Sequence, residues 1–138
     1  MDNNCIFCKI INGEIPSTKV YEDEEFLAFM DINPAVRGHT LVIPKYHCRN
    51  ILDTPENVGK NFYNVISKVS NAVKKAFNAE GIYVFQQNEN AAGQEVFHSH
   101  VHIVPRYKGD DFGKFSPPRL KVEMADIASD GEKIRNSF

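Results

Sequence analysis

Three histidines that alternate with other residues give this chain its clearest chemical signal. His98, His100 and His102 lie in the run His98–Val104, whose sequence is HSHVHIV. The β-branched residues of this run favour a β-strand, in which side chains two apart share one face. We therefore expect a strand over 95–104 that carries three imidazoles in a row. Near neutral pH an imidazole acts as a nucleophile, a proton shuttle or a metal ligand.

Two chemistries remain open for such a row. One is a metal site with several imidazole ligands, and the other is a nucleophilic histidine that its neighbours orient. The preceding segment, residues 88–94, is rich in amides, alanine and glycine, so its backbone N–H groups could hold an anion. An anion site beside a histidine nucleophile favours phosphoryl or nucleotidyl transfer. His39 and His47 would join the row if their strand lies next to it.

A second possible metal motif lies near the N-terminus. Cys5 and Cys8 have the spacing of half a zinc site, and His47 and His98 are candidates for the other two ligands. Two cysteines on an amphipathic helix can equally be small core residues. Cys48 is expected to be a buried, unreactive thiol.

The elements that must position these residues can be read from hydrophobic spacing and turn residues. We expect strands over 19–22, 26–31, 39–44 and 82–87, before the histidine strand that Pro105 closes. Runs of strands with little helical alternation predict an α+β fold, with about five strands in an antiparallel sheet. Residues 1–138 are expected to form a single domain, with an irregular tail from about 109.

Two helices are expected, and a third pattern is weaker. A short helix covers roughly 5–12, and a long amphipathic helix has Thr54 as its N-cap, Pro55 at its first position and Gly81 as its end. A weaker helical pattern runs through Met124, Ile127 and Ala128 and is interrupted by Gly131.

Composition narrows the possible partners and compartment. A formal net charge of -2 argues against a surface for nucleic-acid polymers. No apolar run approaches the roughly 18 residues that span a bilayer, so no membrane partner is expected. Residues 1–4 lack the pattern of a signal peptide, and three cysteines make no disulfide framework, so the cytoplasm is the expected location.

The histidine run resembles the signature of the histidine triad (HIT) family, His-φ-His-φ-His-φ-φ with φ hydrophobic. Four further blocks are similar to family blocks in sequence and spacing: Cys5–Ile11, Ala28–Ile32, Gly38–Lys45 and Ala91–Gln94. The resemblance spans the chain from Cys5 to about Phe112. It implies a HIT-like fold and a nucleotide hydrolase or nucleotidyl transferase.

The resemblance implies a role for each matching position. His100 matches the nucleophile that attacks the α-phosphorus and forms a covalent nucleotidyl-histidine intermediate without a catalytic metal. His102 and His39 match its catalytic neighbours, and Asp31 matches the acid that holds the ribose hydroxyls. The remaining nucleotide-binding positions are the apolar slot for the base, Ile6, Phe7, Ile10, Phe29, Met30 and Ile32, and the phosphate-binding turn, Gly93 and Gln94 with the backbone at Glu95 and Val96.

Three positions depart from the family pattern. Ser99 is polar where a hydrophobic residue is typical. Gln87 stands where an asparagine that reaches the nucleotide is common. Glu95 occupies a position near the leaving group that is often serine or threonine. An acid there either disfavours anionic leaving groups by charge repulsion or points its side chain away, so the resemblance leaves the leaving-group preference open.

The resemblance further implies a structural zinc and a homodimer. In some HIT proteins the positions of Cys5, Cys8, His47 and His98 bind zinc, which would make His98 a ligand rather than a catalytic group. The dimer would form through the long helix and the adjacent sheet edge.

The expected substrates are purine nucleoside 5′-phosphoramidates or related nucleoside monophosphate conjugates. Dinucleoside polyphosphate hydrolysis is an alternative by the same mechanism. A non-catalytic nucleotide- or zinc-binding interaction module, and a hydrolase with a catalytic metal on all three histidines of the row, remain alternatives from other classes.

Overall fold

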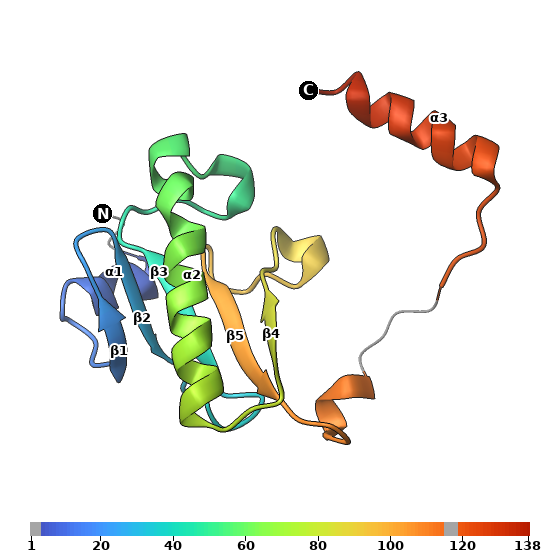
Figure 1. Cartoon of the computed structure of the whole chain (residues 1–138). Helices are drawn as coiled ribbons and strands as arrows, with labels where there is room; N and C mark the ends of the chain where they lie inside the picture. The colour runs from blue at the N-terminus through green and yellow to red at the C-terminus, as the bar shows by residue number, and fades with distance from the viewer. Residues whose placement is uncertain (1–3, 115–118) are drawn as a thin grey trace.

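The computed structural model describes residues 4–114 and 119–138, and five strands form its single antiparallel sheet in the order β1-β2-β3-β5-β4 (Figure 1). One long helix and a short N-terminal helix accompany the sheet, as predicted. The elements are α1 (Ile6–Ile11), β1 (Lys19–Glu22), β2 (Phe26–Met30), β3 (Thr40–Pro44), α2 (Glu56–Ala76), β4 (Gly81–Phe85), β5 (Val101–Arg106) and α3 (Met124–Arg135), with 3-10 turns at Ile51–Asp53, Asn90–Ala92 and Asp111–Lys114.

The strand order brings the separate histidine segments together. β3 and β5 are antiparallel neighbours in the middle of the sheet, with Leu41 opposite His102 and Thr40 opposite Ile103. His39 directly precedes β3, so this register places it beside His102. The convergence expected for neighbouring strands is therefore present.

Each face of the sheet is covered by one helix. On one face the apolar stripe of α2, including Phe62, Val65 and Val69, packs on buried residues of β2, β3 and β5. On the other face α1 inserts Phe7 and Ile10 against β2 and β3. Burial of these stripes stabilises the fold by about 25 cal/mol for each Å² of apolar surface that is removed from water. It also fixes α1 over the strands that carry the histidines.

The long helix begins and ends differently from the prediction. Pro55, not Thr54, is the N-cap, because Thr54 is extended and ends the preceding 3-10 turn, where its hydroxyl donates to the Asn50 carbonyl at 2.6 Å. The helix ends at Ala76, and Gly81 opens β4 rather than ending the helix.

The predicted histidine strand is wrong in its first half. β5 starts at Val101, so only His102 of the three histidines lies in a strand, and residues 95–100 are irregular. In this segment the Ser99 N–H donates to the Cys48 carbonyl at 2.7 Å and does not join a ladder. β5 also continues through Pro105 to Arg106. Because β3 pairs only with residues 101–103, it needs no hydrogen bond from the proline nitrogen, which has no hydrogen.

The C-terminal helix is continuous and stands apart. α3 runs through Gly131 without the predicted interruption, and Figure 1 shows it well clear of the sheet and α2. The predicted irregular stretch at 116–118, like most of the segment tested for a signal peptide, lies outside the described residues. Among the helices of the described ranges, none has the length and apolarity needed to cross a membrane.

Candidate active site and metal centre

The five histidines form two adjoining groups instead of one row. His47 and His98 meet the two N-terminal cysteines on the α1 side of the sheet. His39, His100 and His102 line a cavity at the ends of β3 and β5. The backbone between His98 and His100 joins the two groups.

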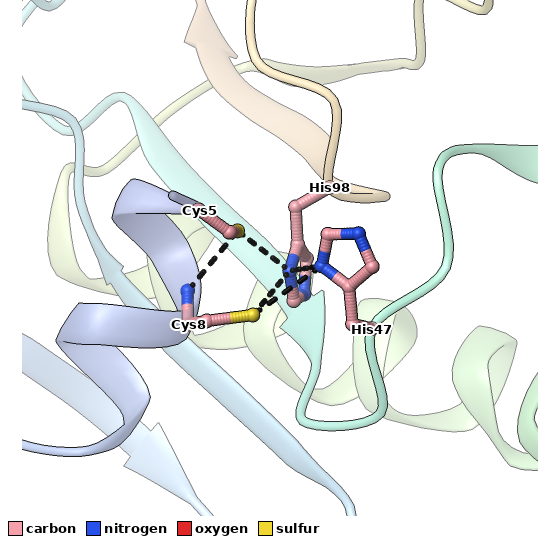
Figure 2. A group of neighbouring side chains, drawn as sticks. All are labelled: Cys5, Cys8, His47 and His98. Carbon is pink, nitrogen blue, oxygen red and sulfur yellow. Dashed lines mark hydrogen bonds between the residues drawn. The ribbon is translucent and has the colours of Figure 1, made fainter. Parts of the chain in front are cut away.

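Two sulfurs and two ring nitrogens converge in the first group, the Cys2His2 group (Figure 2). The His98 Nδ1 atom lies 3.3 Å from Cys5 Sγ and 3.5 Å from Cys8 Sγ, and the His47 Nδ1 atom lies 3.3 Å from Cys8 Sγ. The two Nδ1 atoms are 3.1 Å apart. Around a tetrahedral zinc ion, bonds of about 2.05 and 2.3 Å put neighbouring ligand atoms about 3.3 to 3.8 Å apart, with the sulfur–sulfur pair the longest. These four residues therefore fit zinc.

The proton positions in this group also suit a cation. The His98 Nε2 atom lies 2.8 Å from the Pro44 carbonyl oxygen, which can only accept, so Nε2 carries the proton. The lone pair of Nδ1 is left facing the sulfurs. A backbone carbonyl that fixes the tautomer of a histidine ligand is the usual outer partner in zinc sites.

The two cysteines are held by the start of α1. Cys5 is the N-cap, and its sulfur accepts the Cys8 N–H at 3.2 Å, a contact that favours a thiolate. Burial nevertheless raises the pKa of Cys5 to about 11. A thiolate at this buried position therefore needs a cation, which zinc supplies when it binds.

In the second group, lone pairs and protons alternate. The Ala35 N–H donates to His39 Nδ1 at 3.0 Å, so the proton of His39 lies on Nε2. This Nε2–H donates to His102 Nδ1 at 2.9 Å, which places the proton of His102 on its own Nε2. That Nε2–H is buried and has no hydrogen-bond partner among the described residues. The chain of donors thus ends in an unused donor at the cavity.

His100 has the opposite tautomer from His98. Its Nδ1 lies 2.7 Å from the His98 carbonyl oxygen and must donate to it, so the lone pair of His100 is on Nε2. Burial lowers the pKa of His100, which favours the neutral ring. Burial first, and then the neighbouring histidines, lowers the pKa of His102 to about 4. The site therefore holds a neutral imidazole with a free lone pair beside a neutral N–H donor.

The cavity beside these histidines has a volume of about 390 Å³ and two kinds of wall. Its polar lining includes Asp31, whose Oδ2 lies 3.5 Å from His39 Nε2. Its apolar lining comes mainly from α1 and β2. The predicted nucleotide-binding residues that line it are Ile6, Phe7, Ile10, Phe29, Met30, Asp31, Ile32, Gln87, Gly93, Glu95 and Val96.

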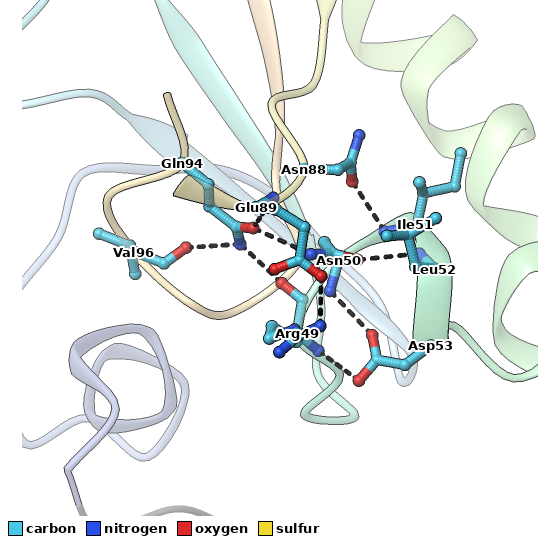
Figure 3. A network of polar contacts seen from close by, with 9 residues as sticks. All are labelled: Arg49, Asn50, Ile51, Leu52, Asp53, Asn88, Glu89, Gln94 and Val96. Carbon is cyan, nitrogen blue, oxygen red and sulfur yellow. Dashed lines mark hydrogen bonds and ion pairs between the residues drawn. The ribbon is translucent and has the colours of Figure 1, made fainter. Parts of the chain in front are cut away.

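Gln94 has a supporting position instead of lining the cavity. Its side chain is 4% exposed, donates to the carbonyls of Arg49 and Val96 at 2.8 and 2.9 Å, and accepts from Asn50 Nδ2 and the Glu89 N–H at 3.0 and 2.8 Å (Figure 3). A side-chain amide has two donor hydrogens and two acceptor lone pairs. All four are used in the Gln94 side chain, so none is left for a ligand.

The turn before His98 is therefore an anion site in part only. The peptide N–H groups of Gly93 and Gln94 donate to carbonyls of Asn90 and Glu89. Within the part of the chain that the structure describes, Glu95 and Val96 donate theirs to no protein group, so these two remain for a phosphate. Gly93 has φ +90°, a backbone conformation that other residues rarely adopt, so a glycine is favoured there; a Cβ would also lie 2.6 Å from Gln87 Nε2 and displace the end of that side chain.

Metal binding by the whole histidine row is not supported. The free nitrogen of His98 faces the cysteines, and Nδ1 of His100 is bound to a carbonyl, so the three rings offer no common point. Asp31, His39 and His102 do approach one another. However, His39 Nδ1 accepts from Ala35, so its Nε2 carries a proton in place of a lone pair.

Sequence reasoning missed three groups that position the histidines. Ala35 and the Pro44 carbonyl fix tautomers through backbone atoms, which no residue type reveals. Phe85 stacks on His102 with ring centroids 4.4 Å apart, and the alternation of its strand could have suggested it.

Cys48 is buried as expected, and burial raises its pKa. Ser99 is buried and accepts from Gln86 Nε2 at 3.0 Å.

Comparison with known proteins gives consistent matches. The HIT domain model matches residues 12–109. "Protein hit" of Bacillus subtilis is 50% identical over 111 residues, 80% of this chain and 77% of its own length. "Adenylylsulfatase HINT3" of Arabidopsis thaliana is 42% identical, with 80% of this chain and 56% of its own length covered. "Adenosine 5'-monophosphoramidase HNT1" of Saccharomyces cerevisiae is 41% identical, with 77% and 65% covered.

Solved structures agree with the fold. A Streptococcus mutans protein superposes with a TM-score of 0.90 at 44% identity, over 99% of this chain and 86% of its own. A HIT family member from Bacillus subtilis gives a TM-score of 0.90 at 39% identity, over 99% and 98% of the two chains. A "ZN-bound histidine triad family protein" from Mycobacterium smegmatis gives 0.76 at 39% identity, over 84% of each chain.

Proposed function

This chain belongs to the HIT domain family and is a nucleotide hydrolase of that family, and we propose that its substrates are purine nucleoside 5′-phosphoramidates or related nucleoside monophosphate conjugates. The observation that carries the proposal is the tautomer of His100. Its Nδ1–H is tied to the His98 carbonyl, which leaves a neutral Nε2 lone pair at the cavity. The activities for which the yeast and Arabidopsis relatives are named, adenosine 5′-monophosphoramidase and adenylylsulfatase, fit the same reaction class.

The reaction follows from the placement of lone pairs and protons. His100 Nε2 attacks the α-phosphorus, a phosphorus–nitrogen bond forms to the enzyme, and the bond to the leaving amine breaks. The amine leaves with a proton taken from solvent, and the unpartnered Nε2–H of His102, which its link to His39 orients, donates a hydrogen bond to the reacting phosphate. Water then attacks phosphorus, displaces His100 and gives up one proton to solvent, which releases the nucleoside monophosphate.

The rest of the cavity suits a nucleoside monophosphate. The carboxylate of Asp31 can accept from ribose hydroxyls, and the apolar wall with Phe7 and Phe29 can enclose a planar base. The N–H groups of Glu95 and Val96 can hold the phosphate oxygens as charge develops on them.

Glu95 favours amine over polyphosphate leaving groups. It lines the cavity and also borders the adjoining hollow between Asn4 and Phe97. A carboxylate there repels the polyanion that leaves in dinucleoside polyphosphate hydrolysis, and it does not repel an amine. The repulsion is modest because Glu95 is exposed, and salt screens it.

The ratio of two kcat/KM values tests the substrate class. The kcat/KM for adenosine 5′-monophosphoramidate should be higher than that for diadenosine triphosphate. Glu95→Gln should reduce the ratio of the two kcat/KM values by about two- to fivefold at low salt. Glu24→Gln removes an exposed charge outside the cavity and is the matched control. A higher kcat/KM for the dinucleotide would establish the alternative substrate class by the same mechanism.

We further propose that the Cys2His2 group of Cys5, Cys8, His47 and His98 binds a structural zinc. Its four donor atoms lie within 4.8 Å of one another, and the Mycobacterium smegmatis relative is described as zinc-bound. Zinc would hold α1, and with it Phe7, against the sheet. Thiolate ligands need reduced cysteines, so this proposal also favours a reducing compartment such as the cytoplasm.

A homodimer through α2 and the β4 edge is the proposed assembly. β4 is the last strand of the sheet on that side, so half of its backbone groups lack a strand partner. Tyr63 of α2 is 77% exposed, and Tyr83 and Val84 of β4 are also exposed. Sedimentation across a range of protein concentrations measures the dimer, and Tyr63→Glu should weaken it.

A further inference from the structure

The helix α3 has no packing partner within its own chain. None of its residues is buried, and Figure 1 places it beyond β4, clear of the sheet and of α2. An isolated helix of 12 residues is marginal in water, and a glycine at its middle weakens it further. This helix therefore needs a surface to pack on.

One face of α3 is apolar and exposed. Met124, Ile127 and Ile134 recur with helical spacing on one side, and they are 77%, 51% and 63% exposed. Leu120 and Phe138 extend this apolar stripe at both ends and are still more exposed. A contiguous apolar stripe on a soluble protein marks a surface for another protein.

The segment before α3 leaves the body at the β4 edge. The Phe112 ring contacts the Tyr83 ring with centroids 5.5 Å apart, and the Arg106 guanidinium lies 4.7 Å above the Phe112 ring. These contacts direct the C-terminal chain outward from the edge where Tyr83 and Val84 are exposed. A second copy seated against this edge would lie between α3 and the body (Figure 1).

The position of α3 is shared with solved structures. The Streptococcus mutans and Bacillus subtilis structures align over 99% of this chain with TM-scores of 0.90, and that span includes α3. The alignment of these chains through α3 supports a common placement of this helix in the related structures.

We propose that the C-terminal arm, residues 119–138, packs the apolar stripe of α3 on the body of a second copy of this chain. Two-fold symmetry makes the exchange mutual, so each arm embraces the other subunit. The inference goes beyond hydrolysis, and it rests only on the proposed dimer through α2 and β4.

Cross-linking between isotopically different copies tests the arm directly. Full-length ¹⁵N-labelled and unlabelled chains are mixed until their subunits exchange and then treated with an amine cross-linker. Lys133 of α3 should join lysines of the body, such as Lys60 or Lys68, in peptide pairs that carry one label of each kind. Pairs with a single label only, or no Lys133 pair while body lysines do cross-link, overturn the proposal.

Two matched double variants separate the stripe from general charge effects. Ile127→Glu/Ile134→Glu places two acids on the stripe and should raise the dimer dissociation constant at least about tenfold, with loss of the mixed Lys133 pairs. Ser129→Glu/Asn136→Glu adds the same charge on the opposite face and should leave both unchanged. Equal effects from the two variants contradict the docking of this face.

The outcomes distinguish this inference from the proposals that precede it. A dimer whose Lys133 pairs lie within one chain overturns the arm and leaves the α2–β4 dimer standing. A chain that is monomeric at every concentration overturns both. Phosphoramidate hydrolysis is measured separately and reports on the catalytic proposal alone.

Discussion

The two histidine groups use the same residue type in opposite ways. In the Cys2His2 group, the outer nitrogen of His98, Nε2, donates to the Pro44 carbonyl, so the unprotonated Nδ1 of that ring faces the two sulfurs. Around His39 and His102 each lone pair already faces a proton, and the sequence of donors starts at Ala35. Converging lone pairs attract a cation, whereas alternating lone pairs and protons fix the direction of each N–H donor. Backbone partners, more than histidine positions, decide which function a ring has.

Replacement of His100 should have the largest effect and should leave the first group intact. His100→Ala removes the proposed nucleophile, so kcat for a phosphoramidate should fall at least about 10⁴-fold. Zinc content and melting temperature of the purified variant show whether the Cys2His2 group survives. Hydrolysis at more than a few per cent of the original rate would refute the assigned nucleophile and favour the metal-dependent alternative.

The hydrogen bond between His39 and His102 predicts that the effects of replacing these two residues on kcat do not add. His102→Ala and His39→Ala should each lower kcat by about 10²-fold, because either change breaks the link of His39 Nε2–H to His102 Nδ1. The double variant should be scarcely worse than either single variant, which a double-mutant cycle measures. Independent losses that multiply to about 10⁴-fold would show two separate roles.

Loss of a cysteine ligand should have the reverse pattern. Cys8→Ser should abolish stoichiometric zinc and lower the free energy of unfolding by about 4 kcal/mol when free zinc is about a thousandfold above its dissociation constant. Since Phe7 lies between the cysteines and its ring is 5.2 Å from that of His100, KM should rise more than kcat falls. Cys48→Ser is the control and should retain zinc. A folded, zinc-free Cys8→Ser protein with a kcat as low as that of His100→Ala would mean that the groups do not divide the work.

The pH profile should give the smallest effect, a shift of its acid limb. Neutral His100 is the active form, so activity is present above its pKa in the folded protein and is lost as pH falls through that pKa. Burial lowers the pKa of His100 and brings that of His102 to about 4, so the limb of kcat/KM should lie below pH 6.5. A midpoint at or above 6.5 would indicate a solvated nucleophile.

The sequence predicted the members of both groups better than their arrangement. The members of the Cys2His2 group were predictable because the cysteine spacing indicates half of a metal site and His47 and His98 were candidates for the rest. The strand over 95–104 was wrong because the His98 side chain turns to the cysteines, and the Ser99 N–H binds Cys48 instead of a neighbouring strand. The sequence pattern indicates which residues suit a strand. It does not indicate which backbone groups form hydrogen bonds outside the sheet.

The supporting residues show the same limit. Gln94 was expected at the phosphate turn, yet its amide is fully used in holding that turn against Arg49 and Asn50. Amide side chains can bind a ligand or support a loop, and only the geometry distinguishes the two. The continuity of α3 was not predicted, because a glycine such as Gly131 suggests a break in a helix when nothing shows what the helix packs against.

Capture of the covalent intermediate tests the central claim, that His100 attacks while His98 serves the metal group. The enzyme is mixed with adenosine 5′-monophosphoramidate, quenched within the first turnovers without acid, and digested for tandem mass spectrometry. The division of roles predicts an adenylyl group on His100 alone. An adenylyl group on His98 or His102, or full turnover with no adenylylated histidine at any quench time, would contradict it.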